Sequence, residues 1–195
     1  MINIKYEDTR VILASASPRR QELLKLIFDS FEVIPSDVEE NLPSGMAVEL
    51  APEYFAKEKC RAVYKNNTDA LVIGCDTGVF IDGKMLGKPH SIEQAFEMLN
   101  MLSGRTHEVI TGCCIKYADK EISFSSITKV KFKKLTYEET ESYINSKEPL
   151  DKAGAYGIQG KGALFIEEIC GDYYSVMGLP VNKLYSAALK ILNED

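Results

Sequence analysis

Short apolar runs alternate with amphipathic segments along this chain of 195 residues, and this alternation constrains the fold most. Apolar runs of about four to eight residues are typical of buried strands, whereas helical spacing of apolar residues is typical of helices that cover a sheet. Strands are predicted at residues 11–14, 31–35, 70–75, 108–117 and 121–132. The dipeptide Asp82-Gly83 favours a hairpin turn within residues 79–86. The pattern therefore predicts an α/β fold with a mixed, twisted sheet flanked by helices.

Local signals place several helices between these strands. A long helix is predicted at residues 47–64, in which Pro52 marks either a kink or the true first turn. Capping boxes are predicted for two further helices, at Ser91 with Gln94 and at Thr136 with Glu139. Because no repeat, low-complexity tract or Pro/Gly-rich linker interrupts the sequence, residues 1–195 are predicted to form a single domain.

Composition and charge argue against several classes of function. The formal net charge is −6, whereas nonspecific nucleic-acid binding requires many Lys and Arg contacts to phosphate. The opening MINIKYEDTR lacks the apolar run of a signal peptide, and no stretch has the length of a membrane span. Five cysteines without a CxxC pair indicate buried thiols rather than zinc ligands or disulfides. The sequence therefore predicts a cytoplasmic protein that binds neither nucleic acid nor a membrane.

A basic turn follows the first predicted strand. The segment LASASPRRQELL places Ser15, Arg19 and Arg20 where that strand meets a helix. Free N–H groups and the positive end of the helix dipole favour an anion at such a junction. Two arginines in the first turn oppose that dipole, and a bound polyphosphate would explain them, because guanidinium groups bind phosphate oxygens in pairs. The alternative is a pair of solvated arginines on an exposed turn.

Carboxylates follow two of the predicted strands. Asp76 comes directly after ALVIGC and precedes Thr77, and Glu39 and Glu40 follow FEVIPSD. The carboxyl ends of strands open into the ligand crevice of α/β sheets. Mg²⁺ often needs only one or two protein carboxylates besides substrate phosphates. Each position is suited to holding a metal or orienting a water; the alternatives are an exposed loop pair and an aspartate that merely starts a turn.

Two lysines and a glutamine complete the candidates. Lys59 lies in the predicted long helix, and Lys88 follows the hairpin within LGKP. A lone lysine is usually a solvated charge, so neither indicates a site by itself. Gln159 lies in the glycine-rich segment DKAGAYGIQGKG, where the backbone can approach a ligand and an amide offers both a donor and an acceptor to a base. An ordinary surface loop is the alternative.

Taken together, these segments resemble the Maf family of nucleotide pyrophosphatases. The matching blocks stand in the family's order over nearly the whole chain: LASASPRRQELL, AKEKCRAV, VIGCDTGVFIDGKMLGKP, MLSGRTHEVITG, EPLDKAGAYGIQGKGALFI and YYSVMGLPV. The resemblance implies a fold similar to that of Maf and inosine triphosphatases, with two lobes around a central cleft. It also implies a divalent metal, Mg²⁺ or Mn²⁺, hydrolysis of a nucleoside triphosphate between its α- and β-phosphates, and a homodimer.

The family pattern carries over residue by residue. It implies that Ser15, Arg19 and Arg20 hold the triphosphate, that Glu40, Lys59, Asp76 and Lys88 occupy the acidic and basic active-site positions, and that Thr77 and Gln159 contact the substrate. The form DKAGAYGIQG is similar to the branch of the family that acts on dTTP and UTP. Cys75, Gly78, Asp172 and Ser175 depart from the usual pattern but leave every proposed catalytic side chain present.

The resulting hypothesis is hydrolysis assisted by a metal bound at Asp76. A carboxylate, either Asp76 or Glu40, accepts the proton of the attacking water, and Lys59 and the other basic residues stabilise charge on the phosphates. The sequence does not distinguish the two carboxylates as base. Two other functions stay open: a purine-directed triphosphate pyrophosphatase, and a noncatalytic regulator, because the family is also associated with inhibition of septum formation.

Overall fold

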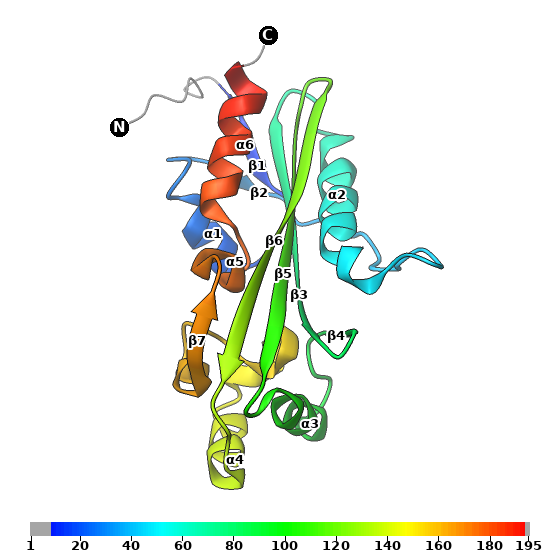
Figure 1. Ribbon diagram of the computed structural model, residues 1–195. Coiled ribbons are helices and arrows are strands. Elements are labelled where there is room, and N and C mark those ends of the chain that lie inside the picture. Colours follow the sequence, from blue (N-terminus) through cyan, green and yellow to red (C-terminus); the bar gives the residue numbers. More distant parts are fainter. Residues whose placement is uncertain (1–8, 194–195) are drawn as a thin grey trace. The chain divides into compact units, whose positions relative to one another are not determined.

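The computed structural model describes residues 9–193, which form strands alternating with helices (Figure 1). The strands are β1 (Val11–Leu13), β2 (Glu32–Val33), β3 (Leu71–Ile81), β4 (Lys84–Leu86), β5 (Thr106–Tyr117), β6 (Lys120–Phe132) and β7 (Ile166–Cys170). The helices are α1 (Pro18–Leu24), α2 (Ala51–Tyr64), α3 (Ile92–Leu102), α4 (Tyr137–Asn145), α5 (Tyr173–Met177) and α6 (Val181–Asn193). Short 3-10 turns are η1 (Val48–Leu50), η2 (Glu148–Asp151), η3 (Ala153–Ala155) and η4 (Lys161–Phe165).

The strands form a mixed sheet, as predicted. Their order is β2-β1-β3-β5-β6-β7, with β4 beside β3. β1 pairs in parallel with β2 and β3, whereas β4 pairs antiparallel with β3, and β7 antiparallel with β6. None of the helices found among residues 9–193 combines the length and apolar character that a membrane crossing requires. The opening residues 1–8, on which part of the cytoplasmic prediction rests, lie outside the described residues.

The described chain divides into two compact units. The first contains residues 9–76, 111–126 and 178–193, and the second contains residues 77–110 and 127–177. β3, β5 and β6 each continue from one unit into the other. The single domain predicted for residues 1–195, and the cleft between two lobes, stay predictions.

In the first unit, α2 packs closely against the strands at two glycines. A Cβ at Gly74 would lie 2.3 Å from the carbonyl oxygen of Ala56, and one at Gly112 would lie 2.3 Å from the backbone nitrogen of Glu53. These separations are far below van der Waals contact, so only glycine permits the helix to lie here. Cys60 and other apolar side chains of this helix join the buried core of β1 and β3.

The core of the second unit contains an aromatic cluster. His107 lies at its centre, with Nε2 2.8 Å from the hydroxyl of Tyr156, and its ring packs edge-on against Phe132. Burial lowers the pKa of His107 to about 4, so the imidazole is neutral near pH 7. Tyr143 and Phe165 extend the cluster, with ring centroids 4.9 Å apart.

Most of the predicted local signals are present. Pro52 lies in the first turn of α2, which begins directly after η1, so it marks the true first turn and not a kink. Asp82 and Gly83 adopt positive φ angles of 52° and 69° at the predicted hairpin. Thr136 and Glu139 form the predicted capping box.

Two expectations are corrected. Ser91 caps α3 by accepting from the N–H of Gln94, but the Gln94 side chain accepts from the N–H of His90, so the second half of the predicted box is absent. Four of the five cysteines are buried, whereas Cys170 is exposed on β7. The prediction that every thiol is buried is wrong at this position because Cys170 is the last residue of a short strand with exposed side chains.

Candidate active site

The basic turn after β1 is organised by Ser15. The hydroxyl of Ser15 accepts from the N–H of Ser17 at 3.4 Å and from Nη1 of Arg20 at 3.0 Å. Ser17 occupies the N-cap position of α1, with Pro18 in the first turn, but its own side chain makes no capping bond. The turn is therefore shaped by a buried hydroxyl that lies two residues beyond the end of the strand.

The two arginines of this turn have different surroundings. Arg20 donates from Nε to the carbonyl of Gly178 at 2.9 Å and from Nη1 to the carbonyl of Cys75 at 2.8 Å. It therefore ties the turn to β3 and to the segment before α6. Arg19 is half-buried, and no hydrogen bond or ion pair is found for it within residues 9–193. The sequence predicts the same phosphate-binding role for both arginines. The structure distinguishes them, because the guanidinium of Arg20 is fixed by protein acceptors and that of Arg19, within the described residues, is not.

Asp76 lies inside a strand and not at its end. β3 was expected to stop near Cys75, but it continues to Ile81. Its earlier part pairs with β1 as far as Ile73, and its later part pairs with β4 from Val79 onward. Asp76 lies between these two paired regions, just past the point where the parallel neighbour β1 has ended. Asp76 therefore lies near the carboxyl end of β1, as ligand-binding residues in α/β sheets often do, but not at the carboxyl end of its own strand β3.

One lysine joins the two predicted acidic positions. Nζ of Lys59, on α2, lies 2.6 Å from Oδ1 of Asp76 and 2.7 Å from Oε1 of Glu40. The side chains of Lys59 and Asp76 are only 13% and 10% exposed, whereas that of Glu40 is 52% exposed. Glu39 is directed elsewhere, since its carboxylate accepts from the side chain of Asn41. The structure therefore separates Glu40 from Glu39, which the sequence left as a pair.

The electrostatic surroundings of Asp76 act in opposite directions. Burial raises the pKa of Asp76 above its ordinary value, the positive charges of Lys59 and Arg20 oppose this rise, and the nearby Glu40 adds to it. The net direction is upward. A buried carboxylate with raised basicity, held by a lysine, is suited to accepting a proton.

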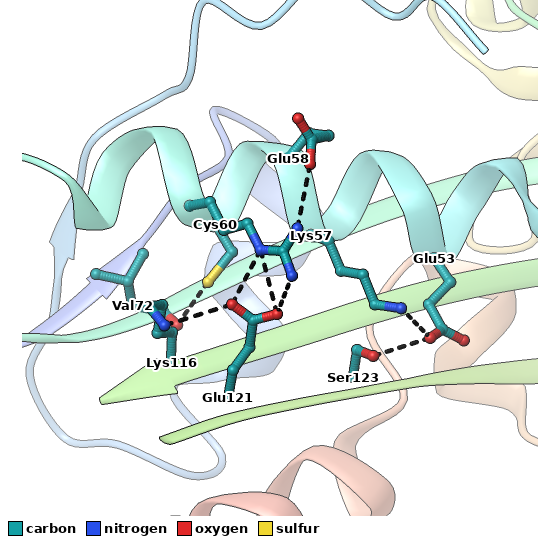
Figure 2. A network of polar contacts seen from close by, with 9 residues as sticks. Glu53, Lys57, Glu58, Cys60, Val72, Lys116, Glu121 and Ser123 are labelled. Atoms are coloured by element: carbon teal, nitrogen blue, oxygen red, sulfur yellow. Dashed lines mark hydrogen bonds and ion pairs between the residues drawn. The ribbon is translucent and has the colours of Figure 1, made fainter. Parts of the chain in front are cut away.

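Polar contacts fix α2, and with it Lys59, to the strands of the same unit. Figure 2 shows Glu53 of α2 beside Lys57 and Ser123, and Glu121 of β6 facing a later turn of the helix. Oε1 of Glu53 lies 2.9 Å from the Ser123 hydroxyl and 2.9 Å from Nζ of Lys57. Arg61 donates from Nη2 to Glu121 at 2.6 Å. Lys59 therefore lies between two points at which the helix is bound to β6.

The remaining candidates belong to the second unit. Lys88 is exposed after β4, Gln159 is exposed between η3 and η4, and Thr77 is half-buried in β3. The N–H of Gly154 donates to the carbonyl of Gly87 at 3.0 Å, which joins the glycine-rich segment to the residue before Lys88. Within the described residues, Lys88 and Gln159 make no hydrogen bond or ion pair with each other.

Sequence reasoning found the charged residues of this site but missed the glycines that support it. The first unit brings together five of the nine predicted side chains: Ser15, Arg20, Glu40, Lys59 and Asp76. Gly74 and Gly112 seat the helix that carries the lysine, and the carbonyl of Gly178 holds Arg20. A glycine inside an otherwise apolar strand is a signal of close backbone approach, so the first two were detectable.

The donor set limits the kind of metal that the site suits. Among the described residues, no group of three or more His, Cys, Asp or Glu side chains is arranged to hold an ion. Asp76 and Glu40 supply carboxylate oxygens around Lys59, which are donors that Mg²⁺ or Mn²⁺ accepts. These side chains therefore fit a cation held jointly with substrate phosphates, not one enclosed by protein ligands alone.

Comparisons with known proteins identify relatives of this chain in sequence and in fold. A chain named dTTP/UTP pyrophosphatase from Bacillus cereus is 51% identical over 180 residues, covering 90% of this chain and 92% of the relative. A chain of the same name from Bacillus anthracis has the same identity and coverage. A HAM1 protein from Coxiella burnetii has a similar fold, with a TM-score of 0.52, 15% identity, and coverage of 93% of this chain and 99% of that one.

A family model described as Maf-like protein matches residues 10–191, which include every residue of the candidate site. That match spans almost the whole chain, and the relatives at 51% identity cover nine-tenths of it. The chain belongs to the Maf-like protein family.

Proposed function

We propose that this protein hydrolyses dTTP and UTP between the α- and β-phosphates, releasing a nucleoside monophosphate and pyrophosphate. The observation that carries the proposal is the buried Lys59–Asp76 pair, with a nitrogen–oxygen distance of 2.6 Å, next to Arg20 of the β1–α1 turn. The choice of nucleotides is supported by the name dTTP/UTP pyrophosphatase of relatives at 51% identity.

In this proposal Asp76 accepts the proton of the water that attacks the α-phosphorus. Asp76 is favoured over Glu40 because its side chain is nearly buried and burial raises its pKa, whereas Glu40 is half exposed. Glu40 holds Lys59 in place from the other side. Lys59, directed at both carboxylates, stabilises negative charge that develops when the water is deprotonated.

The basic turn binds the phosphates in the same proposal. Arg20 is held by three protein acceptors and therefore presents a fixed positive charge. Arg19 has no such partner in the described chain, which leaves its guanidinium available for bidentate contact with phosphate oxygens. Ser15 shapes the turn, and Lys88 adds a cation toward the departing pyrophosphate. Phosphoryl-type transfer depends chiefly on such positioning and charge.

We also propose that Asp76, together with Glu40, holds a divalent cation. When bound, Mg²⁺ or Mn²⁺ would neutralise phosphate charge and lower the pKa of a coordinated water. Thr77 and Gln159 are proposed to contact the substrate, with the amide of Gln159 at the edge of the pyrimidine base. A single domain, a cytoplasmic location and a homodimer complete the proposal.

The test is product release from a panel of nucleotides. Pure protein is incubated with dTTP, UTP, dCTP, CTP, dATP and dGTP in the presence of Mg²⁺, Mn²⁺ or a chelator, and both products are quantified. We expect monophosphate and pyrophosphate in equal amounts, preference for dTTP and UTP, and no turnover with chelator. Turnover of purine nucleotides alone would overturn the substrate assignment, release of orthophosphate would overturn the site of cleavage, and no turnover at all would favour a regulatory protein.

A further inference from the structure

The glycine-rich segment of the second unit is folded around one carboxylate. Oε2 of Glu148 accepts from the N–H of Lys161 at 3.0 Å, and Oε1 accepts from the hydroxyl of Tyr143 at 3.0 Å and from the N–H of Gly162 at 3.4 Å. The same hydroxyl accepts from the N–H of Gly157 at 3.1 Å. Two side chains thus bind three backbone N–H groups within residues 157–162.

The glycines of this segment permit close packing around that carboxylate. A Cβ at Gly160 would lie 2.1 Å from Oε1 of Glu148, and one at Gly162 would lie 2.8 Å from the hydroxyl of Tyr143. Neither glycine, nor Gly157, has a positive φ angle. The glycines are therefore required by close approach, of Glu148 at Gly160, of Tyr143 and the carbonyl of Gly157 at Gly162, and of Lys152 at Gly157, and not by an unusual backbone conformation.

Lys152 closes the same cluster from another side. Its Nζ donates to the carbonyl of Glu148 at 2.7 Å and to Oδ1 of Asp151 at 2.6 Å. A Cβ at Gly157 would lie 2.7 Å from Cε of Lys152, so the aliphatic stem of this lysine covers the start of the segment. Glu148 and Asp151 belong to η2, and Lys152 follows it directly.

The cluster is anchored in the core, whereas the residue between its ends is exposed. Tyr143 is buried, and its ring packs against that of Phe165. Burial raises the pKa of Tyr143 above its ordinary value, so its hydroxyl remains protonated and able to donate to Glu148. Gln159 lies between Gly157, which is bound by Tyr143, and Lys161, which is bound by Glu148, and is itself exposed.

We propose that Glu148 is a positioning residue for nucleotide selection, which fixes the backbone of residues 157–162 so that Gln159 is presented to the base in one orientation. This inference rests on the proposed function, in which Gln159 contacts the pyrimidine. Nothing in it requires Glu148 to touch the substrate. Loss of the carboxylate should therefore affect which nucleotide is bound more than how fast a bound nucleotide is cleaved.

The test compares Glu148→Gln with the control Glu168→Gln. The amide of Glu148→Gln keeps one acceptor oxygen, so at least one of the three donors is left unpaired, whereas Glu168 is an exposed residue of β7 with the same change in charge. We expect hydrogen exchange of Gly157, Lys161 and Gly162 to quicken about tenfold or more in Glu148→Gln and to stay unchanged in the control. This readout does not depend on activity.

Kinetics supply the second readout. We expect KM for dTTP to rise and the preference for dTTP over dCTP to fall about tenfold in Glu148→Gln, while kcat for dTTP stays within about threefold of wild type. Gln159→Ala should lose the same preference, and the double variant should lose little more, because both changes act through one contact. Tyr143→Phe keeps the ring in the core but removes the hydroxyl, so it carries the same test if Glu148→Gln fails to fold.

The outcomes separate the inference from the proposed function. Unchanged exchange, or unchanged preference despite faster exchange, overturns the positioning role of Glu148 while leaving the pyrophosphatase proposal intact. An unchanged preference for dTTP over dCTP in Gln159→Ala would show that Gln159 does not select the base. The positioning role proposed for Glu148 would then be wrong as well. Faster exchange combined with a matching loss of preference in Glu148→Gln and Gln159→Ala supports the inference.

Discussion

The Lys59–Asp76 pair of the first unit and the glycine-rich segment of the second are held in place by different means. Lys59 lies on a helix and Asp76 on a strand. Both side chains are nearly buried, and their opposite charges form an ion pair. Gln159 lies on an exposed turn, and the contacts found in residues 9–193 hold its neighbours Gly157 and Lys161 through their backbone N–H groups. A group that exchanges protons needs a desolvated, fixed environment, whereas a group that recognises a base can lie on a loop whose ends are secured. The following predictions test this contrast.

The largest effect on stability is expected from Lys59→Met. Removing the lysine leaves the buried Asp76 carboxylate without its charge partner, which costs about 3–5 kcal/mol of unfolding free energy in comparable buried pairs. Turnover should also fall by about 10²–10³-fold, as when a group that stabilises transition-state charge is removed. Denaturant unfolding and steady-state rates measure both.

The double variant Lys59→Met/Asp76→Asn is the matched control for that change. It removes both charges, so its unfolding free energy should lie between those of Lys59→Met and the wild type, while turnover stays low. A double variant as unstable as the single one would show that the pair is not electrostatically coupled.

A smaller but still clear effect is expected from Gly112→Ala. The new Cβ would meet backbone atoms of Pro52 and Glu53, so α2 has to move away from β5. We expect a loss of about 1–3 kcal/mol in unfolding free energy and lower turnover, because Lys59 moves with the helix. Gly87→Ala is the control for stability, since a Cβ there has nothing within 4 Å. Equal stabilities of the two variants would contradict the close seating of α2.

The most gradual effect, spread over more than two pH units, concerns the second unit. His107 takes up a proton below about pH 4 when folded but near its ordinary pKa of 6.5 when unfolded. Between these values the unfolded state binds more protons, so acidification from pH 6.5 toward 4 lowers stability, by about 1.4 kcal/mol per pH unit at most from this residue. Replacing His107 by Gln should flatten the measured slope in this window, whereas His90→Gln, at an exposed position, should not. An unchanged slope in His107→Gln would show that the imidazole is not buried in its neutral form.

The sequence predicts most features that depend on neighbouring residues, although the box at Ser91 and Gln94 is only half formed. The capping box at Thr136 and Glu139, the turn at Asp82-Gly83 and the helical start at Pro52 are set by local backbone preferences, and all three are present. Long strands were also found, because periodic apolar residues reflect burial on a sheet.

Features that depend on distant parts of the chain were not predictable in the same way. Nothing local to Glu39 and Glu40 shows which one meets a lysine nineteen positions away, and the structure selects Glu40. The length of β3 was underestimated because its later part pairs with β4, which continues the strand past Asp76. The contacts of Glu148 join residues thirteen and fourteen positions apart, so the sequence does not predict them, although two of the glycines beside it are visible in IQGKG.

The contrast between the two regions is tested most directly by one pair of variants, Asp76→Asn and Gln159→Ala, assayed for kcat and kcat/KM with dTTP and dCTP. The account predicts that Asp76→Asn loses about 10²–10⁴-fold in kcat with both nucleotides and keeps their ratio of kcat/KM. It predicts that Gln159→Ala keeps kcat with dTTP within an order of magnitude but brings the ratio close to one. Near-normal turnover in Asp76→Asn, with its fold intact, would contradict the central role of this carboxylate.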